Sequence, residues 1–357
     1  MVALWVLTTK AATCAAAAAA TAIVMTSCGG QPASSASTPS DRPATTQSAD
    51  AGMTDVNSSC PSSGAVTVSS GRDLKRALSG ATPGQVIVLA PGQYGGHFTV
   101  SRSGTASAPI TLCGPRSAVL DGGGTDAGYT LHLNHASWWR IEGFTVQNGQ
   151  KGVVTDGASH NLITGLYVHQ IGDEAIHLRS LSSDNTVSHN LVRDTGLLSS
   201  FFGEGIYVGS AHKNWCKYSG CQPDRCDRNV IAGNDIASTT AENIDIKEGT
   251  TGGKIIGNRL NGTGMDQSSS TAWINVKGNN WLIQGNTGTD SVQDGMQVHQ
   301  VYPGWGMDNV FRGNTLRVNG PGYGIYVHHK RLRTIVACNN VVSGAGRGFS
   351  NVACTRG

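Results

Sequence analysis

Lysine side chains recur at a fixed place in a short phrase that the chain repeats. Lys247 and Lys277 each follow an apolar–any–apolar triplet in successive copies of this phrase. Two unit charges about 5 Å apart repel by roughly 3 kcal/mol at an effective dielectric of about 20, and about 1.4 kcal/mol equals one pKa unit. We therefore predict that stacking lowers the pKa of one lysine from about 10.4 toward about 8, so that it can act as a general base. The alternative is a pair of surface lysines in salt bridges with neighbouring acids.

Acidic residues stand directly before three consecutive copies of the phrase, at Glu174, Glu204 and Glu242, and Asp245 lies inside the third copy. Like charges that stack directly opposite one another are destabilising. A cation between them would remove that cost, and carboxylate oxygens are suitable ligands for Ca²⁺. We therefore predict that Glu204, Glu242 and Asp245 form a Ca²⁺ site. The alternative is that inserted loops splay these acids apart into solvated turns.

Together these residues could remove the proton beside a sugar carboxylate. That chemistry needs a base, a cation that stabilises the enolate-like intermediate, and a positive or proton-donating group near the leaving oxygen. Lys247 fits the role of the base, and Lys277 or His299 fits the third role. Further polar side chains in the same columns are expected to bind an acidic sugar chain: Arg179, His177, Tyr207, Asn275, Gln297, His328 and Lys330.

These residues come together only if the chain repeats one structural unit. The phrase begins at residues 130, 152, 175, 205, 243, 273, 295 and 324. A fixed repeat of one strand-sized phrase predicts a solenoid, and intervals longer than the shortest ones predict inserted loops on one face. The second and fourth residues must point into the coil, so the third and fifth residues point outward and stack in columns about 4.8 Å apart.

An asparagine ends a second, weaker cluster in many of the repeats. We expect these residues to form a structural ladder, because asparagine tolerates left-handed backbone and can bond to the asparagines above and below it. The positions are Asn190, Asn234, Asn258, Asn286 and Asn314.

The chain is predicted to have three parts. Residues 1–28 have the short apolar run of an export signal, and its end, Met25-Thr26-Ser27-Cys28, resembles a bacterial lipobox. This predicts lipidation of Cys28, the alternative being an ordinary signal peptide cut nearby. Residues 29–59 are rich in Ser, Thr, Ala, Pro and Gln, which predicts a flexible tether. Residues 60–357 form the folded domain, which begins with a short amphipathic capping helix over residues 72–79.

We therefore expect an exported monomer, anchored to the cell membrane on its extracytoplasmic face through the lipid on Cys28. The net charge of +3 over 357 residues is too small to suggest nucleic-acid binding. With 48 glycines and only 14% charged residues, the composition suits tight turns and short strands better than long helices.

Cysteine positions are consistent with an oxidising compartment. Cys60 and Cys113 flank the start of the folded part, and Cys338 and Cys354 flank its end, so disulfides there would pin the ends of the solenoid. The pairing itself cannot be deduced from the sequence. The middle cysteines and a nearby histidine could hold zinc, although one disulfide plus a free thiol is favoured in an exported protein: His212, Cys216, Cys221 and Cys226.

The repeat resembles the right-handed parallel β-helix of the pectate-lyase-like superfamily over roughly residues 65–354. Locally, Glu242–Lys247 resembles the Glu-x4-Lys segment of the chondroitinase B and alginate lyase family, in which the Glu binds calcium and the Lys is the base. Trp273–Lys277 falls where that family carries a catalytic Arg, and this chain has Lys277 instead.

This resemblance implies a polysaccharide lyase that cleaves a uronate-containing acidic polysaccharide by Ca²⁺-assisted β-elimination. A uronate epimerase remains an alternative because it shares the first chemical step. A non-catalytic glycan-binding or cell-wall-associated lipoprotein also remains an alternative, because the fold alone does not specify an activity.

Overall fold

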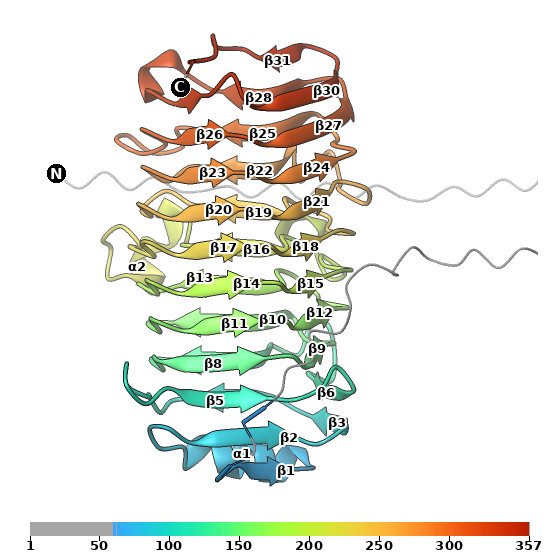
Figure 1. The fold of residues 1–357 in the computed structure, drawn as a ribbon, viewed down its shortest axis with the longest axis vertical. Coiled ribbons are helices and arrows are strands. Elements are labelled where there is room, and N and C mark those ends of the chain that lie inside the picture. Colours follow the sequence, from blue (N-terminus) through green and yellow to red (C-terminus); the bar gives the residue numbers. More distant parts are fainter. Residues whose placement is uncertain (1–59, 62, 357) are drawn as a thin grey trace, which may run out of the picture. The chain divides into compact units, whose positions relative to one another are not determined.

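The described part of the computed structural model is a right-handed parallel β-solenoid that comprises residues 60, 61 and 63–356. Each coil contributes one short strand to each of three parallel sheets, and the coils stack in sequence order (Figure 1). The all-β right-handed parallel β-helix predicted from the repeat is therefore confirmed. Cys28 and the segments 1–28 and 29–59 lie outside the described residues, so the lipidation, tether and export expectations stay predictions.

We name the three sheets A, B and C. Sheet A contains β1 (Val66–Val68), β2 (Val86–Leu89), β5 (Ile110–Cys113), β8 (Trp139–Glu142), β11 (Leu162–Thr164), β14 (Thr186–Ser188), β17 (Val230–Ala232), β20 (Lys254–Ile256), β23 (Leu282–Gln284), β26 (Val310–Arg312) and β29 (Ile335–Val336). Sheet B contains β3 (Gly92–Gly95), β6 (Ala118–Asp121), β9 (Thr145–Gln147), β12 (Tyr167–His169), β15 (Leu191–Val192), β18 (Asp235–Ile236), β21 (Arg259–Asn261), β24 (Thr287–Thr289), β27 (Thr315–Gly320) and β30 (Val341–Ala345).

Sheet C carries the repeated phrase. Its strands are β4 (Phe98–Val100), β7 (Tyr129–Asn134), β10 (Lys151–Asp156), β13 (Ile176–Arg179), β16 (Ile206–Val208), β19 (Ile244–Ile246), β22 (Ala272–Val276), β25 (Asp294–Val298), β28 (Tyr323–Val327) and β31 (Gly348–Ser350). The register pairs His177 with Tyr207, Tyr207 with Asp245, and Asp245 with Asn275. The predicted outward column of third-position residues therefore exists, and apolar partners such as Ile244 and Ile246 are fully buried inside the coil.

Few helices interrupt the coils. They are α1 (Gly71–Ser79), η1 (Ser200–Phe202), η2 (His212–Asn214), α2 (Trp215–Tyr218) and η3 (Lys330–Leu332). Helix α1 coincides with the predicted helix over residues 72–79, and it begins after Ser70, whose side chain accepts a hydrogen bond from the backbone N–H of Asp73. Leu74 and Leu78 of α1 are fully buried. No helix within the described ranges is long and apolar enough to cross a membrane.

The predicted asparagine ladder is confirmed and continues to Asn340. In each step, one asparagine donates from Nδ2 to the Oδ1 of the next asparagine and to a backbone carbonyl, as Asn258 does at 2.9 Å to Asn286 and 3.0 Å to Ile231. A second ladder, which the sequence analysis missed, joins Asn161, Asn185 and Asn229. Buried amide groups that satisfy one another in this way fix the turns between sheets.

Within the described residues, three disulfides join Cys60 to Cys113, Cys216 to Cys221, and Cys338 to Cys354. The first and third tie the two ends of the described solenoid, as the positions of these cysteines suggested. Cys226 is a buried free thiol. The favoured arrangement of one disulfide plus one free thiol is therefore confirmed for the middle cysteines, and the zinc alternative is wrong because two of its sulfurs are bonded to each other.

Candidate functional site

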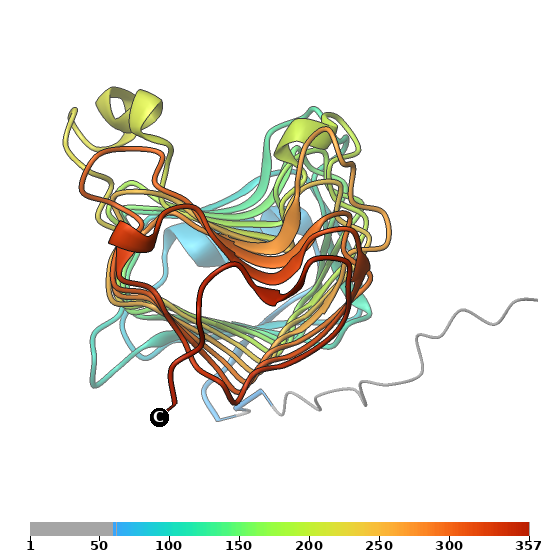
Figure 2. The ribbon, with the colours of Figure 1, turned by 90° about the horizontal axis from the view of Figure 1, so that it is seen from above.

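Loops flank the outer face of sheet C at both ends of its strands (Figure 2). At the C-terminal ends, the insertion after β16, which holds η2 and α2, meets the loop after β25, since the ring of Tyr302 lies 5.0 Å from His212 and 5.2 Å from Trp215. At the N-terminal ends, η1 contacts the loop before β22 through the hydroxyls of Ser200 and Ser269, which lie 3.3 Å apart. The outward columns of sheet C lie between these loops and are largely shielded from water.

Asp245 on β19 lies between the two predicted catalytic lysines. Its Oδ2 is 2.5 Å from Nζ of Lys247, and its Oδ1 is 2.5 Å from Nζ of Lys277. The Asp245 side chain is 1% exposed and those of Lys247 and Lys277 are 15% and 10% exposed, so these are buried ion pairs. The two lysines therefore share one counter-charge and do not simply repel each other.

The predicted fall in the pKa of Lys247 is wrong for this arrangement. Burial by itself lowers the pKa of the Lys247 amine, but the charge of Asp245, followed by Tyr207, Glu204 and Glu242, raises it well above its ordinary value. The salt-bridged alternative describes the geometry correctly, although Lys277 is buried and the Lys247 side chain is only 15% exposed, so neither lies on an open surface. In the cluster as it stands, Lys247 therefore carries a proton.

Glu204, Glu242 and Asp245 converge as predicted. Each offers one carboxylate oxygen, and these oxygens all lie within 4.8 Å of one another. All three residues are buried, so the alternative of splayed, solvated acids is wrong. Burial, together with Glu242 and Asp245, raises the pKa of Glu204 to about 8, and burial and Asp245 raise the pKa of Glu242. Glu174, which precedes the phrase one coil before Glu204, does not join the cluster.

The donor chemistry of this cluster fits a divalent cation. Among the described residues, Glu204 Oε2 is buried without a hydrogen-bond partner, and Asn275 Nδ2 donates to Glu242 Oε1 at 3.1 Å. Both lysines contact Asp245, and no salt bridge within the described residues reaches Glu204 or Glu242. Three converging carboxylates with an unsatisfied buried oxygen are typical of an oxygen-ligand site for Ca²⁺.

Tyr207 lies next to this cluster, although the sequence analysis assigned it only to substrate binding. The Lys247 Nζ is 4.7 Å from the centre of the Tyr207 ring, and the centre of the His177 ring is 4.4 Å from the centre of the Tyr207 ring. Burial raises the pKa of the Tyr207 phenol well above its ordinary range. Tyr207 therefore keeps its proton at neutral pH.

Lys151 is a buried cation that the sequence analysis missed. It forms an ion pair with Glu174, lies 3.6 Å from Asp173, and has a side chain that is 12% exposed. Burial lowers the pKa of Lys151 to about 8, and the charge of Asp173 offsets part of this fall. The sequence did contain a signal for Lys151. It directly precedes the copy of the phrase that starts at residue 152, the position that Glu174, Glu204 and Glu242 occupy in later copies.

Two of the predicted substrate-binding residues are already engaged by the protein. The Arg179 guanidinium donates to both oxygens of Asp156 at 2.7 and 3.0 Å and lies over the ring of Tyr218 at 4.4 Å. Its charge is therefore neutralised within the fold. His177 is 3.0 Å from the carbonyl oxygen of Gly209 through Nε2, so that nitrogen must be the donor.

The remaining predicted residues lie toward the C-terminal coils. The ring of His299 stacks on that of His328 at 5.3 Å, and Gln297 Oε1 is 2.9 Å from His299 Nε2. Lys330 is exposed in η3. Lys277, Asn275, Gln297 and His299 therefore form a continuous polar strip with the acid cluster, whereas Lys330 lies beyond it.

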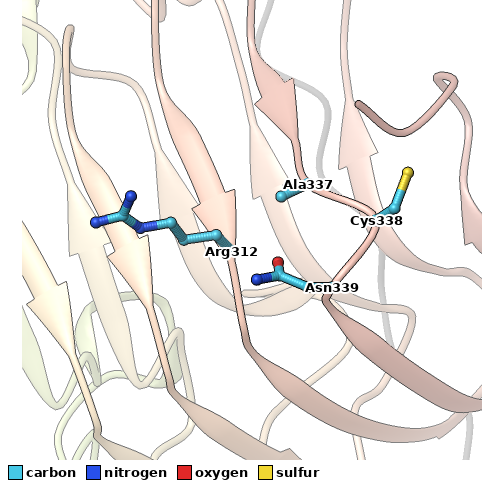
Figure 3. Close-up of a pocket in the computed structure, with 4 residues that line it drawn as sticks. All are labelled: Arg312, Ala337, Cys338 and Asn339. Carbon is cyan, nitrogen blue, oxygen red and sulfur yellow. The ribbon is translucent and has the colours of Figure 1, made fainter. Parts of the chain in front are cut away.

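A separate pocket of about 510 Å³ lies on sheet A (Figure 3). Its lining consists of Arg312 at the end of β26 and the segment after β29, namely Ala337, Cys338 and Asn339. In Figure 3 the Arg312 guanidinium extends away from Asn339. None of the predicted site residues lines this pocket, and Cys338 belongs to a disulfide, so we assign the chemistry to sheet C.

Comparison with known proteins agrees with this architecture. Residues 56–195 match the family model "Pel9A-like, right handed beta helix region", and residues 205–356 match "Right handed beta helix region". An alginate lyase from Paenibacillus sp. str. FPU-7 is 34% identical, with 82% of this chain and 99% of that chain covered and a TM-score of 0.73.

Two less similar structures share the fold. Pectate lyase Pel9A is 16% identical, with 80% of each chain covered and a TM-score of 0.56. The periplasmic alginate epimerase AlgG is 12% identical, with 76% of this chain and 61% of that chain covered and a TM-score of 0.53. No curated protein sequence matches the chain. The shared coils, the matched models and the 34% identical relative show that this chain belongs to the pectate-lyase-like family of right-handed parallel β-helix proteins.

Proposed function

We propose that the protein is a polysaccharide lyase that cleaves a uronate-containing acidic polysaccharide by β-elimination. One observation carries the proposal: Lys247, Tyr207 and the three converging carboxylates lie together on the outer face of sheet C. The alginate lyase that is 34% identical over 99% of its length supports the same reaction class. Alginate is accordingly the first substrate to test.

The reaction removes a proton from the sugar carbon beside the carboxylate and breaks the bond from the neighbouring carbon to the glycosidic oxygen. Lys247, once neutral, accepts the proton, the electron pair forms a carbon–carbon double bond, and the leaving oxygen takes up a proton. Tyr207 keeps its proton beside Lys247, and the Nζ of Lys277 lies on the other side of Asp245, so these two side chains are the candidate donors of that proton.

Glu204, Glu242 and Asp245 would hold a Ca²⁺ ion, whose charge would neutralise the substrate carboxylate, stabilise the enolate-like intermediate and lower the pKa of Lys247. The surrounding side chains keep the cluster buried and orient the lysines through Asp245. Exclusion of water strengthens each of these electrostatic interactions.

The test is incubation with polymannuronate, polyguluronate, pectate and glycosaminoglycans, each with Ca²⁺ or with a chelator. We expect unsaturated uronate ends that absorb in the ultraviolet, formed faster with Ca²⁺ on at least one polymer. Lys254→Ala, on the exposed side of β20 in sheet A, is the matched control and should keep full activity. Absence of unsaturated products from the whole panel would contradict the proposal.

A uronate epimerase is the second candidate, because it starts with the same proton abstraction. Tyr207 favours it, since a protonated phenol beside the base could return a proton to the sugar from a second direction. Exchange of the sugar proton with deuterated water, without chain cleavage, would select the epimerase. Binding of acidic oligosaccharides with no exchange and no cleavage would select a non-catalytic glycan-binding protein.

We also propose that the protein is exported and anchored outside the membrane through a lipid on Cys28. The support is the lipobox-like Met25-Thr26-Ser27-Cys28 and the polar segment 29–59 that follows it. Metabolic labelling with a fatty acid in a bacterial host should label the wild-type protein but not Cys28→Ser. Equal labelling of both, or labelling of neither, would contradict the anchor.

A further inference from the structure

Gln297 on β25 has an amide orientation that its neighbours determine. Its Nε2 donates to Asp294 Oδ2 at 2.7 Å and faces the carbonyl oxygen of Thr271 at 3.4 Å, and its Oε1 accepts from Thr271 Oγ1 at 2.9 Å. A carboxylate and a carbonyl only accept hydrogen bonds, so the NH₂ group must face them. A flipped amide would place Oε1 against both acceptors inside the protein, where Gln297 is 2% exposed.

Asp294 is itself held in place. Its Oδ1 accepts a hydrogen bond from the backbone N–H of Tyr323 on the next coil at 2.5 Å, and Asp294 is 2% exposed. Both carboxylate oxygens therefore act as acceptors, one for the Tyr323 backbone N–H and one for the Gln297 amide. Asp294 thus points one oxygen at Gln297 and determines which end of the amide reaches the outer face.

This orientation assigns the proton on His299. The Nε2 atom of His299 lies 2.9 Å from Gln297 Oε1, which can only accept, so Nε2 carries the hydrogen. In a neutral ring the other nitrogen, Nδ1, then carries a lone pair. Within the described residues, Nδ1 of His299 has no hydrogen-bond partner.

His299 also stays neutral in this setting. Burial, followed by the charges of Lys277 and His328, lowers the pKa of His299 to about 4. Asp245 acts against this shift but makes its close contacts with the two lysines. The ring therefore offers an acceptor beside Lys277, where the sequence analysis expected a positive or proton-donating group.

We infer that His299 is a neutral hydrogen-bond acceptor for a hydroxyl group of the bound sugar, and that Gln297 and Asp294 are positioning residues that fix its tautomer. The inference rests on the proposed function, because it places a sugar on the face of sheet C. A lone pair at Nδ1 repels a carboxylate and attracts a hydroxyl. The protein would thus recognise charge at the Lys247–Lys277 cluster and a hydroxyl group one coil further on.

The tautomer can be measured without any substrate. In ¹⁵N NMR spectra of the full folded protein at pH 7, with His299→Asn used for assignment, we expect a single His299 species protonated at Nε2. Gln297→Met should convert it to a mixture of both tautomers, whereas Gln284→Met, the same change on sheet A, should leave it unchanged. An Nδ1–H tautomer or an imidazolium in the wild type would overturn the assignment.

A second variant guards against misfolding of Gln297→Met. Asp294→Asn keeps the size of the side chain but lets the Gln297 amide face it in either direction, so it should also produce mixed tautomers. A single unchanged tautomer in a folded Gln297→Met protein would show that neither residue positions His299, and one in a folded Asp294→Asn protein would remove Asp294 from the positioning role.

The acceptor role is tested by binding to the Lys247→Ala protein. Loss of one neutral hydrogen bond in His299→Ala should raise the Kd for an acidic oligosaccharide roughly threefold to tenfold. An unchanged Kd would overturn the contact. If no acidic oligosaccharide binds, the proposed function and the acceptor role both fail, while the NMR result still decides the positioning by Gln297.

Discussion

Asp245 pairs with both lysines of the cluster, because it places one carboxylate oxygen beside the Nζ of Lys247 and the other beside the Nζ of Lys277, and its charge raises the pKa of Lys247. A buried ion pair is costly to break, since the partner left behind carries an uncompensated charge. Lys247 can act as a base only when additional positive charge offsets the acids around it. Under the proposed mechanism, turnover therefore depends on a cation that occupies the carboxylate cluster.

Replacement of Lys247 should nearly abolish turnover. Lys247→Ala removes the base, and Lys247→Arg leaves a guanidinium that keeps its proton at any usable pH, so kcat should fall by about 10² to 10⁴ in both. The measurement is the initial rate of formation of unsaturated ends, with circular dichroism to check folding and Lys254→Ala as the control. Near-normal turnover by Lys247→Arg would mean that the lysines only clamp an acidic chain.

The ionisation of Glu204 should be visible in the pH dependence of stability. Its folded pKa of about 8 lies above the ordinary value of 4.5, so the folded state binds more protons than the unfolded state between these values. Stability from this group is therefore present below about 4.5, falls as the pH rises, and is lost above about 8. Thermal unfolding at pH 5 to 9 should show a decline that Glu204→Gln removes.

Calcium provides the matching test on the same residue. A cation that binds the folded cluster stabilises it by mass action, so Ca²⁺ should raise the Tm of the wild type at pH 8 to 9. Glu204→Gln should show a much smaller rise. Equal rises in Tm for both proteins would place the ion elsewhere. No rise for either would indicate that a proton shared between the buried acids, and not Ca²⁺, removes their repulsion.

The turns between sheets depend on the asparagine ladder. Asn258 accepts from the backbone N–H and the Nδ2 of Asn234, and it donates to Ile231 and Asn286. Each strand is short, so its backbone hydrogen bonds alone hold only a few residues in register. The ladder adds a continuous set of bonds along the stacking direction.

Removal of one ladder residue should therefore destabilise the fold by more than the small size of its side chain suggests. Asn258→Ala leaves a buried N–H and a buried carbonyl unsatisfied, which we expect to lower the free energy of unfolding by about 2 to 4 kcal/mol. Urea unfolding measures this loss, and Thr287→Ala on the exposed side of β24 serves as a control that should change little. A loss below about 1 kcal/mol for Asn258→Ala would show that water replaces the amide.

At the scale of the whole described solenoid, loops from distant coils assemble one face. The insertion after β16 and the loop after β25 start three coils apart, yet Tyr302 contacts both His212 and Trp215. His212 is in turn held by Glu248, 2.8 Å from its Nδ1. Coils stack only on their neighbours, so such loop contacts are what couple distant coils.

Tyr302→Ala should loosen this contact without unfolding the coils. An aromatic pair is worth about 0.5 to 1.5 kcal/mol, so the Tm should change little while hydrogen exchange of residues 211–222 increases. Turnover should fall because that loop flanks the face of sheet C. Tyr302→Phe keeps the ring and should behave like the wild type; unchanged exchange in Tyr302→Ala would mean that the loops hold their places independently.

Much of the fold follows from the sequence because its cause is local and repeated. The alternation in Asn243–Lys247 places Ile244 and Ile246 inside the coil, and stacking then places Asp245 beside Asn275 and Lys247 beside the next coil. The same logic brought Glu204, Glu242 and Asp245 together and predicted the ladder through Asn258 and Asn286.

The protonation states were decided only by the tertiary structure. Equal spacing in the sequence suggests that Lys247 and Lys277 repel, but the direction of the Asp245 side chain makes them partners. Lys151, which stands in the glutamate column, has the lowered pKa instead, because burial outweighs its acidic partners. A pKa and a tautomer depend on burial and on distances of a few ångströms, and these arise from inserted loops and side-chain directions that no repeat in the sequence encodes.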